Sequence, residues 1–127
     1  MKSLFTIILL IAFKVASADV IDDVAVAFKA GNSKALAAYF STTVELSVLN
    51  TEEIYSRAQA ELILKDFFQK NPPKGVKVIH KVVSNANYKF GVISMVTAKD
   101  NFRVSYELKN NAGKFLINQI RIEAIKE

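Results

Sequence analysis

Apolar and polar positions follow a helical period in the segment after residue 18. Apolar side chains recur at positions 21, 24, 25 and 28, which is the spacing of one helical face, so we expect a helix from Asp19 to Ala30 that Gly31 ends. Asn32 and Ser33 then offer a cap for a short second helix. The apolar side of that second helix consists of Leu36, Tyr39 and Phe40. The domain is therefore predicted to begin as a helical corner.

A short strand and a long helix come next. Alternation over residues 44–48 predicts a half-buried strand, and Glu52 and Glu53 are expected to lie in a loop. From Tyr55 onward a broad apolar stripe indicates the main helix, in which Ser56 and Gln59 have the spacing of a capping box. The stripe consists of Ala60, Ile63, Leu64, Phe67 and Phe68. Asn71-Pro72-Pro73 ends this helix, because proline lacks the backbone N–H and clashes with the preceding turn.

Beyond Gly75 the period changes to two. Four strands are predicted, over residues 76–83, 88–98, 101–109 and 114–124, and short polar turns separate them. Such turns are typical of an antiparallel meander. Because the helices come first and the meander last, we expect one α+β domain whose N-terminal helices pack on a curved antiparallel sheet.

The strand over residues 88–98 is apolar on both of its faces. Phe90, Val92 and Val96 lie on one face, and Ile93 and Met95 lie on the other. A sheet that helices cover on one side only is expected to have a polar outer side. We therefore predict a homodimer through the sheet face, the alternative being that scattered apolar surface residues are ordinary.

The first 18 residues have the pattern of a secretory signal peptide. Lys2 precedes an apolar run over residues 4–13, and Ala16-Ser17-Ala18 forms a small-residue cleavage site, so the mature domain is expected to span residues 19–127. The alternative, a retained membrane anchor, needs about 20 apolar residues. We predict a periplasmic or secreted protein, free of the membrane after cleavage. Cysteine is absent, so neither a lipid anchor nor a disulfide is expected.

The charged residues argue against nucleic acid as a partner. Without Lys2 and Lys14 the formal charge of +5 falls to +3, and the lysines are scattered singly along the chain. Proteins that bind nucleic acid concentrate basic residues on one face and interleave stacking aromatics. No phosphate loop or glycine fingerprint occurs, so no cofactor is expected.

Candidate residues for catalysis are few. His80 is the sole histidine, and alternation places it beside Val78 and Val82, facing the helices. There it would act as a base or polarising group, or it would be a core histidine that a backbone carbonyl satisfies. Glu123 with Arg121 is the one pair that fits a pocket edge, although a cross-strand ion pair is the commoner use. One histidine without cysteine does not furnish a zinc site, and no metal is expected.

A pocket between the helices and the curved sheet is the remaining candidate site. Aromatic residues would line it and His80 or Ser94 would supply polar contacts, unless the aromatics simply fill the core. The predicted lining residues are Tyr39, Phe40, Tyr55, Phe67, His80, Phe90, Ser94, Phe102 and Tyr106.

Several segments resemble one known family. "AGNSKALAAYF", "YSRAQAELILKDFFQKNPP", "FRVSYELK" and "IRIE" are similar to a secreted bacterial family described as domain of unknown function 4783. The order of the elements also resembles the nuclear transport factor 2-like, or cystatin-like, cone. The resemblance implies that fold and an exported setting, and it implies no activity. Because this fold serves enzymes, ligand binders and association modules alike, it does not choose among functions.

Together these observations favour a non-catalytic exported domain that binds a small apolar ligand or a protein partner. The alternative is a cofactor-free lyase or isomerase that uses His80 in the cone pocket.

Overall fold

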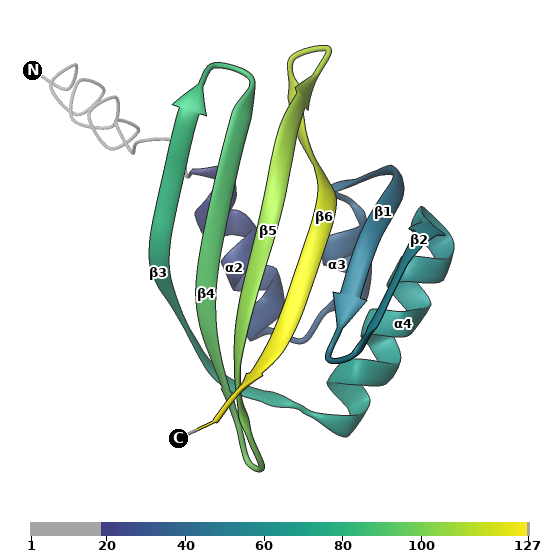
Figure 1. The fold of residues 1–127 in the computed structure, drawn as a ribbon, viewed down its shortest axis with the longest axis vertical. Coiled ribbons are helices and arrows are strands. Elements are labelled where there is room, and N and C mark those ends of the chain that lie inside the picture. The colour runs from purple at the N-terminus through teal and green to yellow at the C-terminus, as the bar shows by residue number, and fades with distance from the viewer. Residues whose placement is uncertain (1–18, 127) are drawn as a thin grey trace, which may run out of the picture.

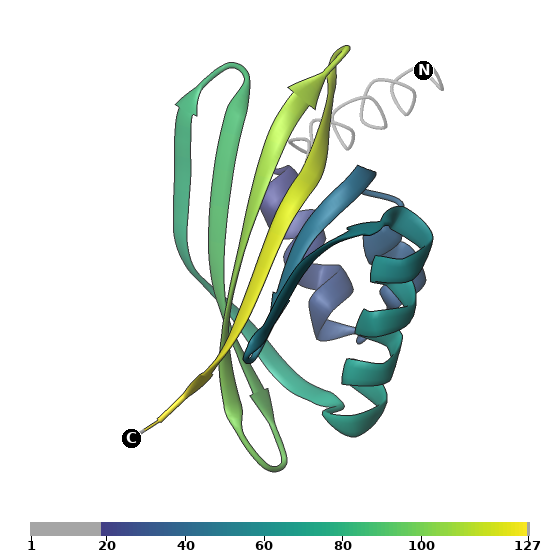
Figure 2. The same cartoon turned by 45° about the vertical axis from the view of Figure 1, so that its right-hand side comes forward.

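A computed structural model describes residues 19–126, and in this range three helices lie on one side of a curved six-stranded sheet (Figures 1 and 2). The helices are α2 (Val20–Lys29), α3 (Ser33–Ala37) and α4 (Arg57–Lys70). The strands are β1 (Phe40–Val48), β2 (Thr51–Ser56), β3 (Pro73–Asn85), β4 (Tyr88–Thr97), β5 (Asn101–Asn111) and β6 (Lys114–Ile125). The predicted signal peptide lies outside the described residues. None of the described helices is long and apolar enough to span a membrane.

The strands are ordered β2-β1-β6-β5-β4-β3 across the sheet. The predicted meander is confirmed, since β3, β4, β5 and β6 pair antiparallel in sequence order. However, β1 pairs with β6 in parallel, so the sheet is mixed and not wholly antiparallel. A parallel neighbour requires a crossover connection, and here everything between β1 and β6 in the chain forms that connection.

Strand β2 replaces the loop that the sequence predicts around Glu52 and Glu53. It forms a hairpin with β1 through a tight turn in which Leu49 has a positive φ of 58°. As an edge strand, β2 is exposed at every residue except the half-buried Tyr55. It therefore lacks the burial alternation from which strands are predicted.

Local capping explains where the helices begin and end. The predicted capping box of α4 is confirmed: the Gln59 amide donates to the Ser56 hydroxyl over 3.2 Å, and the Gln59 side chain accepts from the Ser56 amide. Gly31, with φ of 62°, ends α2, and the side chain of Asn32 caps α3. Two bonds close the corner between them, from the Gly31 amide to Phe28 and from the Asn32 amide to Ala27. Such a left-handed glycine is the usual end of a helix.

The core lies between the helices and the sheet face that they cover, the inner face. The aromatic ring of Phe28 stacks on Tyr106 at 5.9 Å and meets Phe68 edge-on at 6.0 Å. The Tyr106 hydroxyl donates to the carbonyl of Ile21 over 2.7 Å, which ties β5 to α2. Gly91 makes this approach possible, because a Cβ there would lie 2.8 Å from Ile21 Cγ2. The helical layer is thus fixed to the sheet by apolar packing and a buried hydrogen bond.

Candidate functional site

The predicted aromatic pocket is largely filled. Four of its proposed lining residues are core residues whose side chains are at most 5% exposed: Phe40, Phe67, Phe102 and Tyr106. Phe67 and Phe102 meet edge-on with ring centroids 5.2 Å apart. Burial raises the pKa of the Tyr106 hydroxyl, so this group stays neutral. These aromatics serve the alternative that the sequence left open, which is to fill the core.

His80 does not face the helices, and the expectation that it does is wrong. Val78 pairs with Ile93 whereas His80 pairs with Val92, so Ile79 is an extra residue in β3. Such a bulge reverses the alternation of side chains beyond it. Accordingly Lys81 lies on the inner side, where its ammonium is 2.7 Å from the Asp22 carboxylate of α2. His80 is exposed on the opposite side of the sheet.

The predicted positions of Phe90 and Ser94 are also wrong. On β4 the inner positions are Gly91, Ile93 and Met95, which contact or belong to the buried core. Phe90 and Ser94 alternate with them and therefore lie on the outer side, both half-buried. The pocket predicted from the sequence combined residues from two opposite sides of the sheet.

The last two predicted pocket residues are half-buried and line separate surface clefts. Tyr39 borders a cleft of about 330 Å³ next to α2 and α3. Tyr55 borders one of about 210 Å³ between the β1–β2 hairpin and Ile63 of α4. The structure therefore does not bring the nine predicted residues together into one site.

The sheet surface that faces away from the helices, called here the outer face, is the first candidate site. Residues that pair across antiparallel strands share a face. One row across the sheet runs from β2 to β3 through Glu52, Ser47, Arg121, Ser105, Val92 and His80. The next row runs through Ile54, Glu45, Gln119, Glu107, Phe90 and Val82. Both rows are polar over β1, β6 and β5 and become apolar over β4.

Carboxylates gather at the centre of the outer face around Arg121. The pKa of Glu45 is raised, first because its carboxyl group hydrogen-bonds Glu52, then through burial and the negative charges of Glu52 and Glu107; Arg121 opposes the shift. Burial, followed by a hydrogen bond to Glu107, raises the pKa of Tyr88. Among residues 19–126, no group of three or more acidic or histidine side chains is arranged to hold a metal ion.

The carboxylate cluster has no sequence signal, because its members lie far apart along the chain. Glu45 lies on β1 and Glu107 on β5, and both are on the outer face. What brings them together is the placement of β6 between β1 and β5. No local pattern records that long-range pairing.

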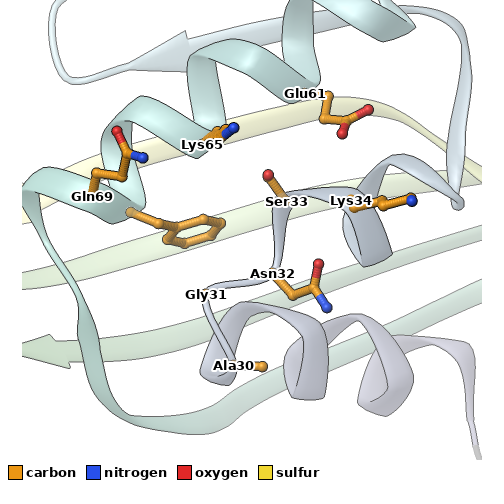
Figure 3. Close-up of a pocket in the computed structure, with 9 residues that line it drawn as sticks. Ala30, Gly31, Asn32, Ser33, Lys34, Glu61, Lys65 and Gln69 are labelled. Carbon is orange, nitrogen blue, oxygen red and sulfur yellow. The ribbon is translucent and has the colours of Figure 1, made fainter.

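A cleft between the α2–α3 corner and α4, called here the polar cleft, is the second candidate site (Figure 3). Its volume is about 540 Å³. Its lining residues are Ala30, Gly31, Asn32, Ser33 and Lys34 on one wall, and Glu61, Lys65, Phe68 and Gln69 of α4 on the other. The Ser33 side chain, which is 8% exposed, points toward α4 in Figure 3. No sequence pattern predicts this site, since its residues are ordinary helix-cap and helix types.

Comparison with known proteins identifies the family. The model of the domain of unknown function DUF4783 matches residues 21–123. A DUF4783 protein of Bacteroides fragilis is 37% identical, with a TM-score of 0.77 over 81% of this chain and 96% of the other. One from Bacteroides uniformis is 30% identical, with a TM-score of 0.82 over 86% of this chain and 100% of the other.

More distant neighbours share only the fold. A Xanthomonas campestris protein described as a calcium/calmodulin-dependent protein kinase II association domain is 18% identical, with a TM-score of 0.66 over 85% of this chain and 84% of the other. A chain whose name begins Rd1NTF2 and a Nostoc punctiforme domain with a cystatin-like fold are also among them. Curated proteins give no match. The chain therefore belongs to the DUF4783 family and has the nuclear transport factor 2-like fold.

Proposed function

We propose that this protein is a non-catalytic association domain that pairs with a second copy of itself through the outer face. The observation that carries the proposal is the contrast between a filled interior and a half-buried aromatic on the open side. Phe40, Phe67, Phe102 and Tyr106 occupy the space in which a small apolar ligand would lie. Phe90 and the exposed Val82 and Val96 instead offer apolar surface where no helix covers the sheet.

The two ends of the outer face are complementary to each other. A two-fold axis parallel to the strands, between β5 and β6, would reverse each row of residues against its partner. Ile54, which is 70% exposed at the β2 end, would then meet Val82 at the β3 end. In the adjacent row Glu52 would meet His80, and at the centre Gln119 would meet Glu107. At the ends of the rows, apolar residues cover each other and the acid reaches the imidazole. Between the ends and the centre, the same operation sets Phe90 against Glu45 and Val92 against Ser47. Aligned sheets pack in this way at about 30° to each other.

This arrangement explains His80 better than catalysis does. The cone pocket that a His80-dependent lyase or isomerase needs is on the other side of the sheet. Two neighbours with the same fold are described as association domains, which is consistent with a role in assembly. Their likeness to this chain concerns the fold alone. We further propose that the protein works outside the cytoplasm, on the strength of the signal pattern in residues 1–18.

The test uses a matched pair of exposed apolar residues, one on each side of the molecule. Ile54→Glu places a charge in the proposed interface, and Leu62→Glu places the same charge on α4, where the side chain is 64% exposed. Protein purified from its native host would be studied by sedimentation equilibrium, and its N-terminal residue, expected to be Asp19, checks the predicted cleavage. We expect a wild-type dimer that Ile54→Glu weakens by roughly tenfold or more, because the carboxylate is desolvated without a partner.

Leu62→Glu should leave the dimer unchanged. A wild-type protein that stays monomeric at high micromolar concentration would overturn the proposal. A dimer that responds equally to both substitutions, or to neither, would place the interface elsewhere.

A further inference from the structure

The polar cleft has the volume of a small-molecule site, and backbone and core contacts fix its walls. Its volume of about 540 Å³ falls within the range of roughly 300–1,000 Å³ that is usual for ligand pockets. Its walls belong to the α2–α3 corner and α4. Figure 2 shows these helices on the side of the sheet opposite the outer face. A dimer formed through the outer face therefore leaves it open.

The walls of the polar cleft are held by backbone and core contacts. The corner wall is closed by the hydrogen bonds of the Gly31 and Asn32 amides, and a Cβ at Gly31 would lie only 3.1 Å from Pro73 Cδ. On the α4 side, Phe68 is 5% exposed and its ring packs edge-on against Phe28. A backbone that is fixed in this way needs little rearrangement when a ligand binds, which lowers the entropic cost.

The polar side chains of this cleft have no partners among themselves. Glu61 and Lys65 are four residues apart on α4, the orientation that favours an ion pair, yet no such pair within 4.0 Å joins them in the described structure. In the next turn Asp66 and Lys70 do pair, at 3.1 Å. Within residues 19–126, the side chains of Ser33, Lys34 and Gln69 likewise make no intramolecular hydrogen bond or ion pair.

The chemistry of these side chains favours an anion attached to an apolar body. In Figure 3, Gln69, Lys65 and Ser33 follow one another along the cleft, and Lys34 and Glu61 lie at its other end. An ammonium, a hydroxyl and an amide that lie in a row are donors suited to a carboxylate. Phe68 contributes apolar surface to the lining. Lys34 balances the charge of Glu61, so the cleft has a net formal charge of +1.

We propose that the polar cleft binds a small organic acid, with its carboxylate held by Lys65, Ser33 and Gln69 and its apolar part against Phe68. Neutral or cationic molecules of the same shape fit the apolar lining but lack the charge that Lys65 complements. The proposal is independent of self-association, because it concerns a different side of the molecule.

The experiment is an NMR titration of the purified protein with three probes of one shape: 3-phenylpropionate, 3-phenylpropanamide and phenethylamine. The carboxylate should perturb the backbone amides of residues 31–34 and 61–69 and bind more tightly than the other two. Lys65→Ala should weaken its binding by about tenfold or more, the usual effect of losing a hydrogen bond to a charged group. Glu61→Gln should strengthen it.

Two controls match these substitutions in charge at remote positions. Lys99→Ala, in the β4–β5 turn, and Glu53→Gln, on β2, change the net charge equally and should leave the affinity unchanged. The proposal is overturned if the amide analogue binds as tightly as the acid, if Lys65→Ala and Lys99→Ala act alike, or if the perturbed amides lie outside the cleft. Absence of binding at millimolar concentration overturns it as well.

Discussion

The side chains on the two faces of strand β4 differ in burial and in the role that we infer for them. On β4 the inner residues Ile93 and Met95 are fully buried against the helices. On the outer face of the same strand, Phe90 is half-buried and Val92 is 9% exposed, although no helix covers them. The inner face therefore provides the stability of the monomer. On the outer face, Phe90, Val82 and Val96 leave apolar surface that no helix covers, which is why we propose this face for association.

The largest expected effect comes from replacing one phenylalanine on each side of the sheet. Phe28→Ala removes a fully buried ring that packs on Tyr106 and Phe68, so it should lower the free energy of unfolding by about 3–5 kcal/mol. Phe90→Ala removes a half-buried ring and should cost the monomer about 1 kcal/mol. Urea unfolding at low protein concentration measures both losses. Equal losses would mean that the outer face belongs to the core of the monomer.

The inner face was predictable where local patterns decide the structure. Residues 21, 24, 25 and 28 do form the buried side of α2, and Ser56 does cap α4 as predicted. Alternation also located β3 to β6 to within a few residues. In these elements the period of burial and the identity of the cap depend on neighbours in the chain, so the sequence alone suffices.

The candidate sites were not predictable because long-range pairing decides them. The bulge at Ile79 moves His80 to the outer face, and nothing in "VKVIHKVV" marks the extra residue. Parallel pairing of β1 with β6 assembles Glu45, Glu107 and Arg121 from three distant segments. The polar cleft likewise needs the α2–α3 corner to dock against α4. One-residue shifts and docking angles of this kind leave no local signature.

A smaller effect tests the hydrogen bond that attaches the inner face to α2. Tyr106→Phe removes the donor to the Ile21 carbonyl and should cost about 1 kcal/mol in urea unfolding. A pH series checks the cause. Burial raises the pKa of Tyr106, so the folded state retains a proton that the unfolded state releases above about pH 10. Wild-type stability therefore falls as the pH rises past that value, and the variant should show a shallower fall. An unchanged alkaline slope would contradict the buried, neutral hydroxyl.

The smallest expected effect is a gain in stability, from a substitution on the outer face. The hydrogen bond with Glu52 is the main reason that the pKa of Glu45 is raised. The folded state therefore holds a proton that the unfolded state releases from about pH 4 upward, and stability declines as the pH rises through the interval between the two pKa values. Glu45→Gln keeps a group that can hydrogen-bond Glu52 but removes the repulsion, so it should stabilise the protein slightly at pH 7 and not below about pH 4. Because the two carboxylates act as a pair, Glu52→Gln should give a similar gain, and the double substitution should yield less than the sum. A loss of stability at pH 7 in either single variant would show that Arg121, and not the neighbouring acid, dominates this part of the face.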